Sequence, residues 1–235
     1  TTASNNTAVG YDALTANTTG NYNVAVGQQT LNANTTASSN TAVGYQAGYS
    51  NTTGTEMTAV GIEALHSNTT GNTNSALGRR SLYNNTTGVN NSAFGARVMN
   101  NSTTGSYNVS VGMDSLYSNT TASNNTAVGY QAGYSNASYN NAFGANALGA
   151  TTTGYGNVAV GEGAGLSNTT GHSNVFIGSY TGSSEAAGRF STGNENTYVG
   201  QSAGSTMSSG SKNTILGGYN GNQGGLDIRT SSNNI

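Results

Sequence analysis

A glycine recurs with a 17-residue period along most of this 235-residue chain, and this spacing constrains the fold more than any other feature. Each glycine ends a triplet in which a small residue and a larger apolar residue precede it. The first eight are Gly10, Gly27, Gly44, Gly61, Gly78, Gly95, Gly112 and Gly129. The column continues at Gly144, Gly161, Gly178, Gly200 and Gly217, with a shorter step into Gly144 and a longer step into Gly200. The sequence therefore predicts thirteen tandem repeats with one two-residue deletion and one five-residue insertion.

Other positions of the repeat are also constant, and we number them from this glycine as position 0. Small-apolar pairs such as Ala13-Leu14 occupy positions +3 and +4, and Asn-Thr-Thr-Gly follows, as in residues 17–20. Only Met57 interrupts an asparagine column at position −4. That column consists of Asn6, Asn23, Asn40, Asn74, Asn91, Asn108, Asn125, Asn140, Asn157, Asn174, Asn196 and Asn213.

Each part of the repeat favours a local conformation. Val-Ala-Val segments such as residues 24–26 are typical of short strands, and Asn-Thr-Thr-Gly is typical of a turn. Glycine and asparagine recur too often for a helix. We expect two short strands and two corners per repeat, and hence an all-β solenoid or β-roll of thirteen coils, each one repeat long, stacked about 4.8 Å apart. Stacking would align the asparagines of position −4 into a ladder of side-chain amides.

Alternation along the strand gives each coil two unlike faces. In the first repeat Thr7 and Val9 share one face and Ala8 lies on the other. One coil thus offers about one Val and one Leu, worth roughly 3–6 kcal/mol if fully buried, against a larger entropy cost of ordering the chain. We therefore expect lateral association into a homo-oligomer, with the alanine column near the contact between chains.

Composition excludes several classes of function. Charged residues make up 6% of the chain, the net charge is −2, and only six residues are Lys or Arg, so nucleic acid is not expected as a partner. No apolar run approaches the ~20 residues that span a bilayer, so this segment is not expected to insert into a membrane. The chain has no Cys or Pro. Its apolar residues recur at fixed places, which distinguishes it from a disordered chain.

The sequence predicts no catalytic residue, no cofactor and no metal site. His66 and His172 occupy different positions of the repeat, and acids such as Asp12 and Glu63 are too sparse for a calcium-binding repeat. The glycines of residues 161–165 lack the strand-then-helix context of a nucleotide loop. We therefore do not expect an enzyme.

Two other residue patterns could carry function. The Asn-Thr-Thr turns match the acceptor pattern for N-glycosylation, which is an alternative to turn chemistry alone. Tyrosines gather at positions +1, +5 and −5, where they could cover the edges of the roll or contact carbohydrate. The candidate glycan acceptors are Asn17, Asn34, Asn51, Asn68, Asn85, Asn119 and Asn168. The tyrosines are Tyr11, Tyr45 and Tyr130 at +1, Tyr49, Tyr83, Tyr117 and Tyr134 at +5, and Tyr22, Tyr107 and Tyr139 at −5.

The pattern Asn-x-Ala-x-Gly followed by a small-apolar pair resembles the head repeats of trimeric autotransporter adhesins and the repeats of some bacteriophage tail-fibre proteins. The matching residues of the first repeat are Asn6, Ala8, Gly10 and Ala13, and residues 213–220 are especially similar to phage tail-fibre sequence. The resemblance covers about residues 1–220. It implies a left-handed β-roll of three parallel chains about a common axis, although the repeats of the adhesins are usually shorter than those of this chain.

These observations predict a structural fibre, extracellular or on a virion surface: a phage tail-fibre shaft involved in host attachment. The alternative is a bacterial surface adhesin head or extracellular filament, with ice binding and functional amyloid less favoured. The expected partners are further copies of the chain, as a homotrimer, and a cell-surface glycan or protein receptor.

The repeat also predicts the organisation of the chain. Residues 1–217 are expected to form the solenoid shaft, residues 182–196 to carry the insertion as an outward loop, and residues 218–235 to form a divergent segment leading to a further module. Thr1 and Thr2 occupy the positions that Thr18 and Thr19 occupy in the next repeat, so the chain opens inside a repeat. We therefore expect it to be part of a longer fibre.

Overall fold

The computed structural model describes residues 2–182, 192–218, 220–223, 226–227 and 230–234. The chain divides into two compact units, Thr1–Ser123 and Asn124–Ile235. The described residues contain thirteen strands of three residues, two further strands of two residues, and no helix. The predicted all-β solenoid is therefore confirmed, and each unit is described by itself below.

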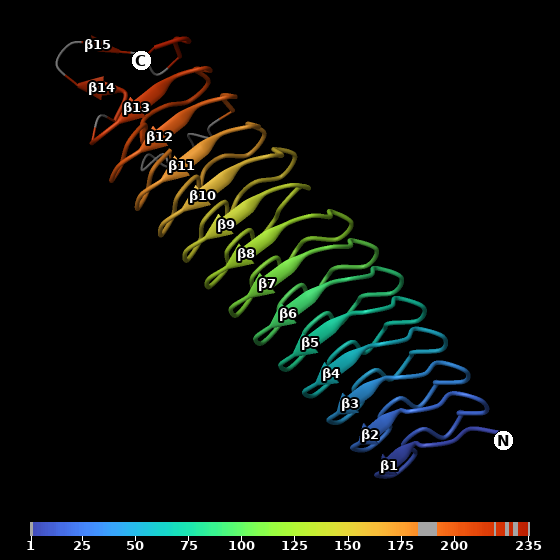
Figure 1. Ribbon diagram of the computed structural model, residues 1–235. Helices are drawn as coiled ribbons and strands as arrows, with labels where there is room; N and C mark the ends of the chain where they lie inside the picture. The colour runs from blue at the N-terminus through green and yellow to red at the C-terminus, as the bar shows by residue number, and fades with distance from the viewer. Residues whose placement is uncertain (1, 183–191, 219, 224–225, 228–229, 235) are drawn as a thin grey trace. The chain divides into compact units, whose positions relative to one another are not determined.

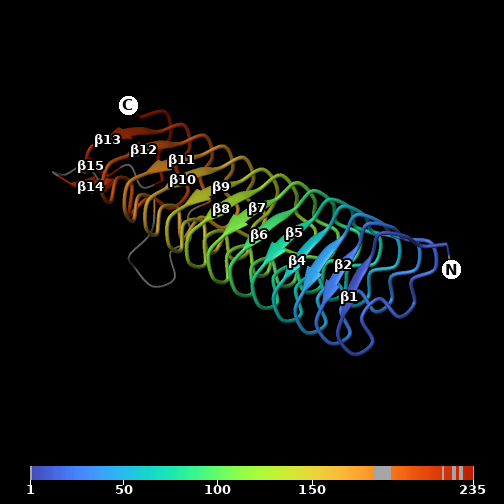
Figure 2. The same ribbon diagram turned by 60° about the horizontal axis from the view of Figure 1, so that its bottom comes forward.

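Seven strands of the first unit run parallel, each beside the next in chain order (Figures 1 and 2). Successive coils pair with the step of the repeat, so that Ala25 lies opposite Ala42 and Val26 opposite Val43. The strands are β1 (Thr7–Val9), β2 (Val24–Val26), β3 (Thr41–Val43), β4 (Thr58–Val60), β5 (Ser75–Leu77), β6 (Ser92–Phe94) and β7 (Val109–Val111).

The second unit continues the same pattern through both irregular repeats. Thr126 pairs with Asn141 across the deletion, and Val175 pairs with Thr197 across the insertion. The columns thus resume where the sequence predicts. The expected outward loop at Ser183, Ser184, Glu185 and Arg189 lies outside the described residues. The strands are β8 (Thr126–Val128), β9 (Asn141–Phe143), β10 (Val158–Val160), β11 (Val175–Ile177), β12 (Thr197–Val199) and β13 (Thr214–Leu216).

The divergent C-terminal segment contains a short antiparallel pair, β14 (Asn222–Gln223) and β15 (Leu226–Asp227). The asparagine column then continues at Asn234, whose backbone N–H and Nδ2 both donate to Oδ1 of Asn213, at 3.0 and 2.7 Å. The pair of short strands therefore lies within a coil of 21 residues, counted from Asn213 to Asn234.

Each regular coil contains one three-residue strand, so the prediction of two short strands per repeat is wrong. Positions +2 and +4 lie in the left-handed region of backbone space, as at Gln29 (φ 55°) and Leu31 (φ 49°). Two such residues, separated by a single residue, turn the chain instead of extending it. Position −5 is also left-handed, for example at Tyr22 (φ 59°) and Asn90 (φ 56°). The corners of the coil therefore include non-glycine residues in a conformation that usually costs about 1–2 kcal/mol.

The interior of the coil is formed by the small face of the strand, contrary to expectation. Ala25 and Ala42, at position −2, are fully buried, and Leu31 and Leu65, at position +4, pack in the same interior. The larger residues at position −1 point outward. The alanine column is therefore core and cannot form the contact between chains, because the coil's own turn already covers it.

Four glycines at position +4, Gly48, Gly165, Gly182 and Gly204, make room for large inward side chains from other positions. A Cβ at Gly165 would lie 2.6 Å from Cδ2 of Phe176, and one at Gly204 would lie 2.6 Å from Cδ2 of Tyr198. At Gly48 the space is taken by the terminal methyl of Met57, which explains the single break in the asparagine column. The volume of the interior is thus conserved while its residues vary, as close packing requires.

Candidate functional site

The asparagines of position −4 form a buried ladder along the coils. Asn91 donates its backbone N–H and its Nδ2 to Oδ1 of Asn74, at 3.0 and 3.2 Å, and a second Nδ2 bond reaches the carbonyl of Gly105 at 2.8 Å. Asn108 repeats the pattern one coil further on. Each side chain therefore links three successive coils, which makes the ladder a structural element and leaves its amides unavailable to a ligand.

The asparagines of the Asn-Thr-Thr turns form a second ladder. Nδ2 of Asn68 donates to Oδ1 of Asn51 at 2.9 Å and to the carbonyl of Gly71 at 3.0 Å. The side chains of Asn34, Asn51, Asn68, Asn85, Asn119 and Asn168 are buried. A glycan would be attached to this same Nδ2 atom. The structure therefore supports the turn interpretation and offers no accessible acceptor at these six residues, and at half-buried Asn17 Nδ2 also donates to a carbonyl.

The hydroxyl of the first threonine is bonded to the next coil in most of the turns. The hydroxyl of Thr52 donates to the carbonyl of Thr69 at 3.0 Å, and that of Thr69 donates to the carbonyl of Thr86 at 3.0 Å. The second threonine, such as Thr70, is exposed. Hydroxyls of the two threonines thus do not form one flat array on the surface.

An apolar stripe runs along the outer face of the strands. It consists of the residue at position −1, which is Val, Leu, Phe or Ile in every repeat, and the apolar residues at position +1 beside it. Leu77 is 48% exposed and Phe94 is 41% exposed, although both are large and apolar. In the first unit the stripe comprises Val9, Tyr11, Val26, Val43, Tyr45, Val60, Ile62, Leu77, Phe94, Val111 and Met113.

Another surface of the first unit carries rings and charges together. The ring of His66 stacks between Tyr49 and Tyr83, with centroids 5.2 and 4.9 Å apart. Arg80 pairs with Glu63 at 2.5 Å and lies over the ring of Tyr83, 5.3 Å from its centroid. These residues occupy positions +2 and +5. We call position +5, where the rings gather, the aromatic column.

The stacking of His66 predicts a pH dependence of stability. Burial lowers the pKa of His66 below its ordinary value of 6.5. The charge of Glu63 raises this pKa by less than burial lowers it, and the charge of Arg80 lowers it further. Between pH 6.5 and the lower pKa of the folded state, His66 of the unfolded chain binds a proton more readily than His66 of the folded chain. The free energy of unfolding therefore decreases as pH falls through this range. We expect the thermal midpoint of the chain to fall between pH 7.5 and pH 5.

His66→Tyr continues the aromatic column without a titrating imidazole, and it should remove that part of the pH dependence while leaving the midpoint at pH 7.5 nearly unchanged. Thermal unfolding followed by circular dichroism at several pH values measures both. Equal pH profiles for the two chains would contradict the assignment to His66.

The other histidine and the remaining tyrosines lie elsewhere on the coil. His172 stacks on Tyr155 at position −6, with centroids 4.8 Å apart, so the two histidines do occupy different columns. Tyr22 and Tyr107, at position −5, are exposed and left-handed. The three tyrosine groups therefore have different surroundings, and stacking at position +5 is shown for Tyr49 and Tyr83.

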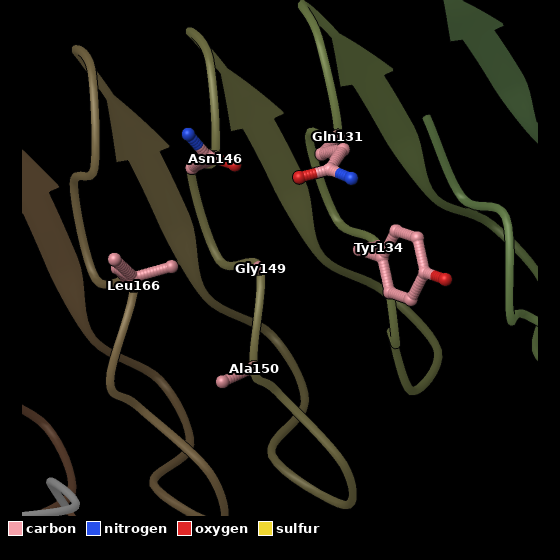
Figure 3. Close-up of a pocket in the computed structure, with 6 residues that line it drawn as sticks. All are labelled: Gln131, Tyr134, Asn146, Gly149, Ala150 and Leu166. Atoms are coloured by element: carbon pink, nitrogen blue, oxygen red, sulfur yellow. The ribbon is translucent and has the colours of Figure 1, made fainter. Parts of the chain in front are cut away.

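A slot interrupts the aromatic column in the second unit. At position +5 the chain has Tyr134, then Gly149, then Leu166, and the space above Gly149 lies between the ring of Tyr134 and the side chain of Leu166 (Figure 3). The cavity has a volume of about 220 Å³, and Gln131, Asn146 and Ala150 complete its lining. The slot is partly open to solvent.

The part of the chain that the structure describes contains no group of three or more His, Asp or Glu residues placed to hold a metal ion. Among these same residues there is also no helix long and apolar enough to cross a membrane. Comparison with protein-family models, with curated proteins and with solved structures gives no match. The geometry of the coils is therefore the basis for the functional argument.

Sequence reasoning singled out the asparagine and glycine columns but missed the apolar stripe and the slot. The expectation that the alanine column lies near the contact between chains left the face of the larger residues without a role on the surface. The slot has a signal in the sequence, since Gly149 is the one glycine at position +5 among the residues that the structure describes. A column-by-column comparison of the repeats would have found it.

Proposed function

We propose that this chain is a segment of an extracellular structural fibre, of the kind that forms bacteriophage tail-fibre shafts in host attachment, and that three copies associate in parallel through the apolar stripe. The single observation that carries this proposal is the outward orientation of the apolar residue at position −1 in coil after coil. A bacterial surface adhesin head would use the same stripe, and would differ in what the fibre is attached to.

The area of the stripe is similar to that of one side of a stable interface. A Val, Leu or Phe side chain about 40% exposed presents on the order of 60 Å². The eleven residues of the stripe in the first unit then present roughly 650 Å², close to the ~800 Å² per partner of a standard interface. Position −1 carries no charged residue in any repeat, and the charged residues beside it at position +1 are Arg79 and Glu162.

The ladders explain why such a chain suits a shaft. Neighbouring coils are joined by their strands and, in most repeats, by the two asparagine columns and the threonine hydroxyls. A coil contacts mainly its neighbours in the sequence. Adding repeats lengthens such a structure along one axis. Its stability does not depend on a charged surface or on a large hydrophobic core. The similarity of the repeat to those of phage tail fibres supports the same conclusion.

The test is the mass of the assembly in solution. For the wild-type chain at micromolar concentration, light scattering coupled to size exclusion should give about three times the 23.5 kDa of one chain. Leu77→Asp together with Phe94→Asp places two charges in the stripe and should shift the population to monomer. A stable wild-type monomer would overturn the proposal.

A matched control places the same two charges in neighbouring coils, outside the stripe. Thr70 and Thr87 are exposed second threonines of the turns, one repeat apart in the chain just as Leu77 and Phe94 are. Thr70→Asp with Thr87→Asp should keep the wild-type mass. Dissociation of this control as well would show that general charge repulsion, and not the stripe, determines assembly.

A further inference from the structure

We propose that the slot above Gly149 binds one pyranose ring of a saccharide. This inference is separate from the fibre function proposed above, because the slot is lined by residues of a single chain and does not require association of chains. None of the lining residues Gln131, Tyr134, Asn146, Gly149, Ala150 and Leu166 belongs to the apolar stripe.

The slot lies where one repeat lacks a side chain in the aromatic column. In the first unit, consecutive coils place rings in the aromatic column at centroid separations of 5.2 and 4.9 Å. Strand spacing of about 4.8 Å sets this separation. Where Gly149 replaces such a residue, the column lacks one six-membered ring, and the neighbouring rungs of Tyr134 and Leu166 bound the space on either side.

The backbone does not require glycine at this position. Gly149 does not have the left-handed φ of the glycines at positions 0 and +4, and the column elsewhere carries Tyr, His, Asn and Leu. A Cβ at Gly149 would lie 2.9 Å from Cδ1 of Leu166, which is the flexible end of a side chain. The glycine thus opens a cavity that the fold could have filled.

The lining determines the class of ligand. Tyr134 and Leu166 supply apolar surfaces that suit the C–H face of a sugar ring, and tyrosine is suited to such amphipathic contacts. Gln131 and Asn146 supply side-chain amides, each with donors and an acceptor for hydroxyl groups. No lining residue is charged, so the slot favours a neutral ring over an anion or a cation.

The size of the slot limits the ligand to one ring. A volume of about 220 Å³ is below the ~300 Å³ at which pockets for drug-sized ligands begin. A single ring in an open slot should bind weakly, with a Kd on the order of 1 mM. In a parallel assembly of three chains the slot would occur once per chain, and a surface glycan with repeated rings would gain avidity from that arrangement.

The test is saturation-transfer NMR and titration calorimetry of the full chain with free glucose, galactose, mannose and N-acetylglucosamine. At least one of these sugars should bind the wild-type chain. Gly149→Tyr fills the slot with the ring that neighbouring repeats carry, and it should weaken binding at least tenfold without lowering the thermal midpoint. Tyr134→Ala should weaken binding to a similar degree.

Tyr83→Ala is the matched control, because it removes a ring from the same column in the other unit and should leave sugar binding unchanged. Failure of all four sugars to bind would overturn the proposal, as would binding that Gly149→Tyr does not affect. Binding of phenol in the absence of any sugar binding would also overturn it, in favour of an aromatic ligand. The assembly mass of Gly149→Tyr should equal that of the wild type, so loss of sugar binding and loss of association are separate results.

Discussion

Gly78→Ala is expected to disrupt the stacking of the coils on either side of it, at a cost of more than about 4 kcal/mol. Gly78 has a φ of +132°, which side-chain-bearing residues rarely adopt, and a Cβ there would lie 2.6 Å from the carbonyl carbon of Gly95 and nearer still to its oxygen. The obstructing atoms are backbone of the next coil, so relief requires that the two coils separate. Hydrogen exchange of the amides in β5 and β6 should accelerate strongly.

Two controls separate the clash from backbone strain. Gly217→Ala introduces a side chain at φ +100° with no atom within 4 Å, so its cost should reflect strain alone. Gly156→Ala, at φ +66°, meets its nearest atom at 3.8 Å in a column where other repeats carry Tyr and Asn, and it should cost about 1 kcal/mol. Equal losses for Gly78→Ala and Gly217→Ala would contradict the role assigned to the contact between coils.

Asn91→Ala is expected to cost about 4 kcal/mol, because it removes four side-chain hydrogen bonds within a buried ladder. Two of these bonds are donated by Nδ2, to Asn74 and Gly105, and two are accepted by Oδ1 from Asn108. The partners that remain are buried, so each group left unpaired costs ~1–3 kcal/mol. Denaturant unfolding at fixed protein concentration, combined with hydrogen exchange near β6, measures the loss.

The neighbouring asparagine provides the control for Asn91→Ala. Asn90 is exposed and left-handed, at a position where other repeats carry Ser39 and Ser173. Asn90→Ser should change stability by less than about 1 kcal/mol. A small effect of Asn91→Ala, similar to that of Asn90→Ser, would show that the ladder does not stabilise the coils.

The sequence by itself determined the repeat, the position of the strand that ends before each periodic glycine, and the pairing of neighbours. Because strands of identical repeats pair in register, the regular spacing of the glycines already implied that Ala25 lies opposite Ala42. The irregular steps implied the altered pairings across the deletion and the insertion. The asparagine column implied a ladder, since a buried side-chain amide requires partners and the same residue recurs at the same place in neighbouring coils.

Only the tertiary structure decided which face of the strand is inside. Alternation divides Val24, Ala25 and Val26 between two faces but does not say which face the coil encloses. Left-handed residues at positions +2, +4 and −5 bend a short coil tightly around the strand, and the space enclosed in a regular coil accepts an alanine and one leucine. The larger residue at position −1 therefore points outward.

The same curvature explains why the prediction of a second strand is wrong, and why the burial of the turn asparagines and the slot did not follow from the sequence. Leucine and glutamine give no local signal for a left-handed backbone, so the turns at Gln29 and Leu31 could not be predicted from their residue types. The Asn-Thr-Thr turns fold asparagines such as Asn68 inward, where Nδ2 of Asn68 bonds to Asn51 of the neighbouring coil. A missing side chain at Gly149 becomes a cavity only because its neighbours in space, Tyr134 and Leu166, lie one repeat away on either side of it in the chain.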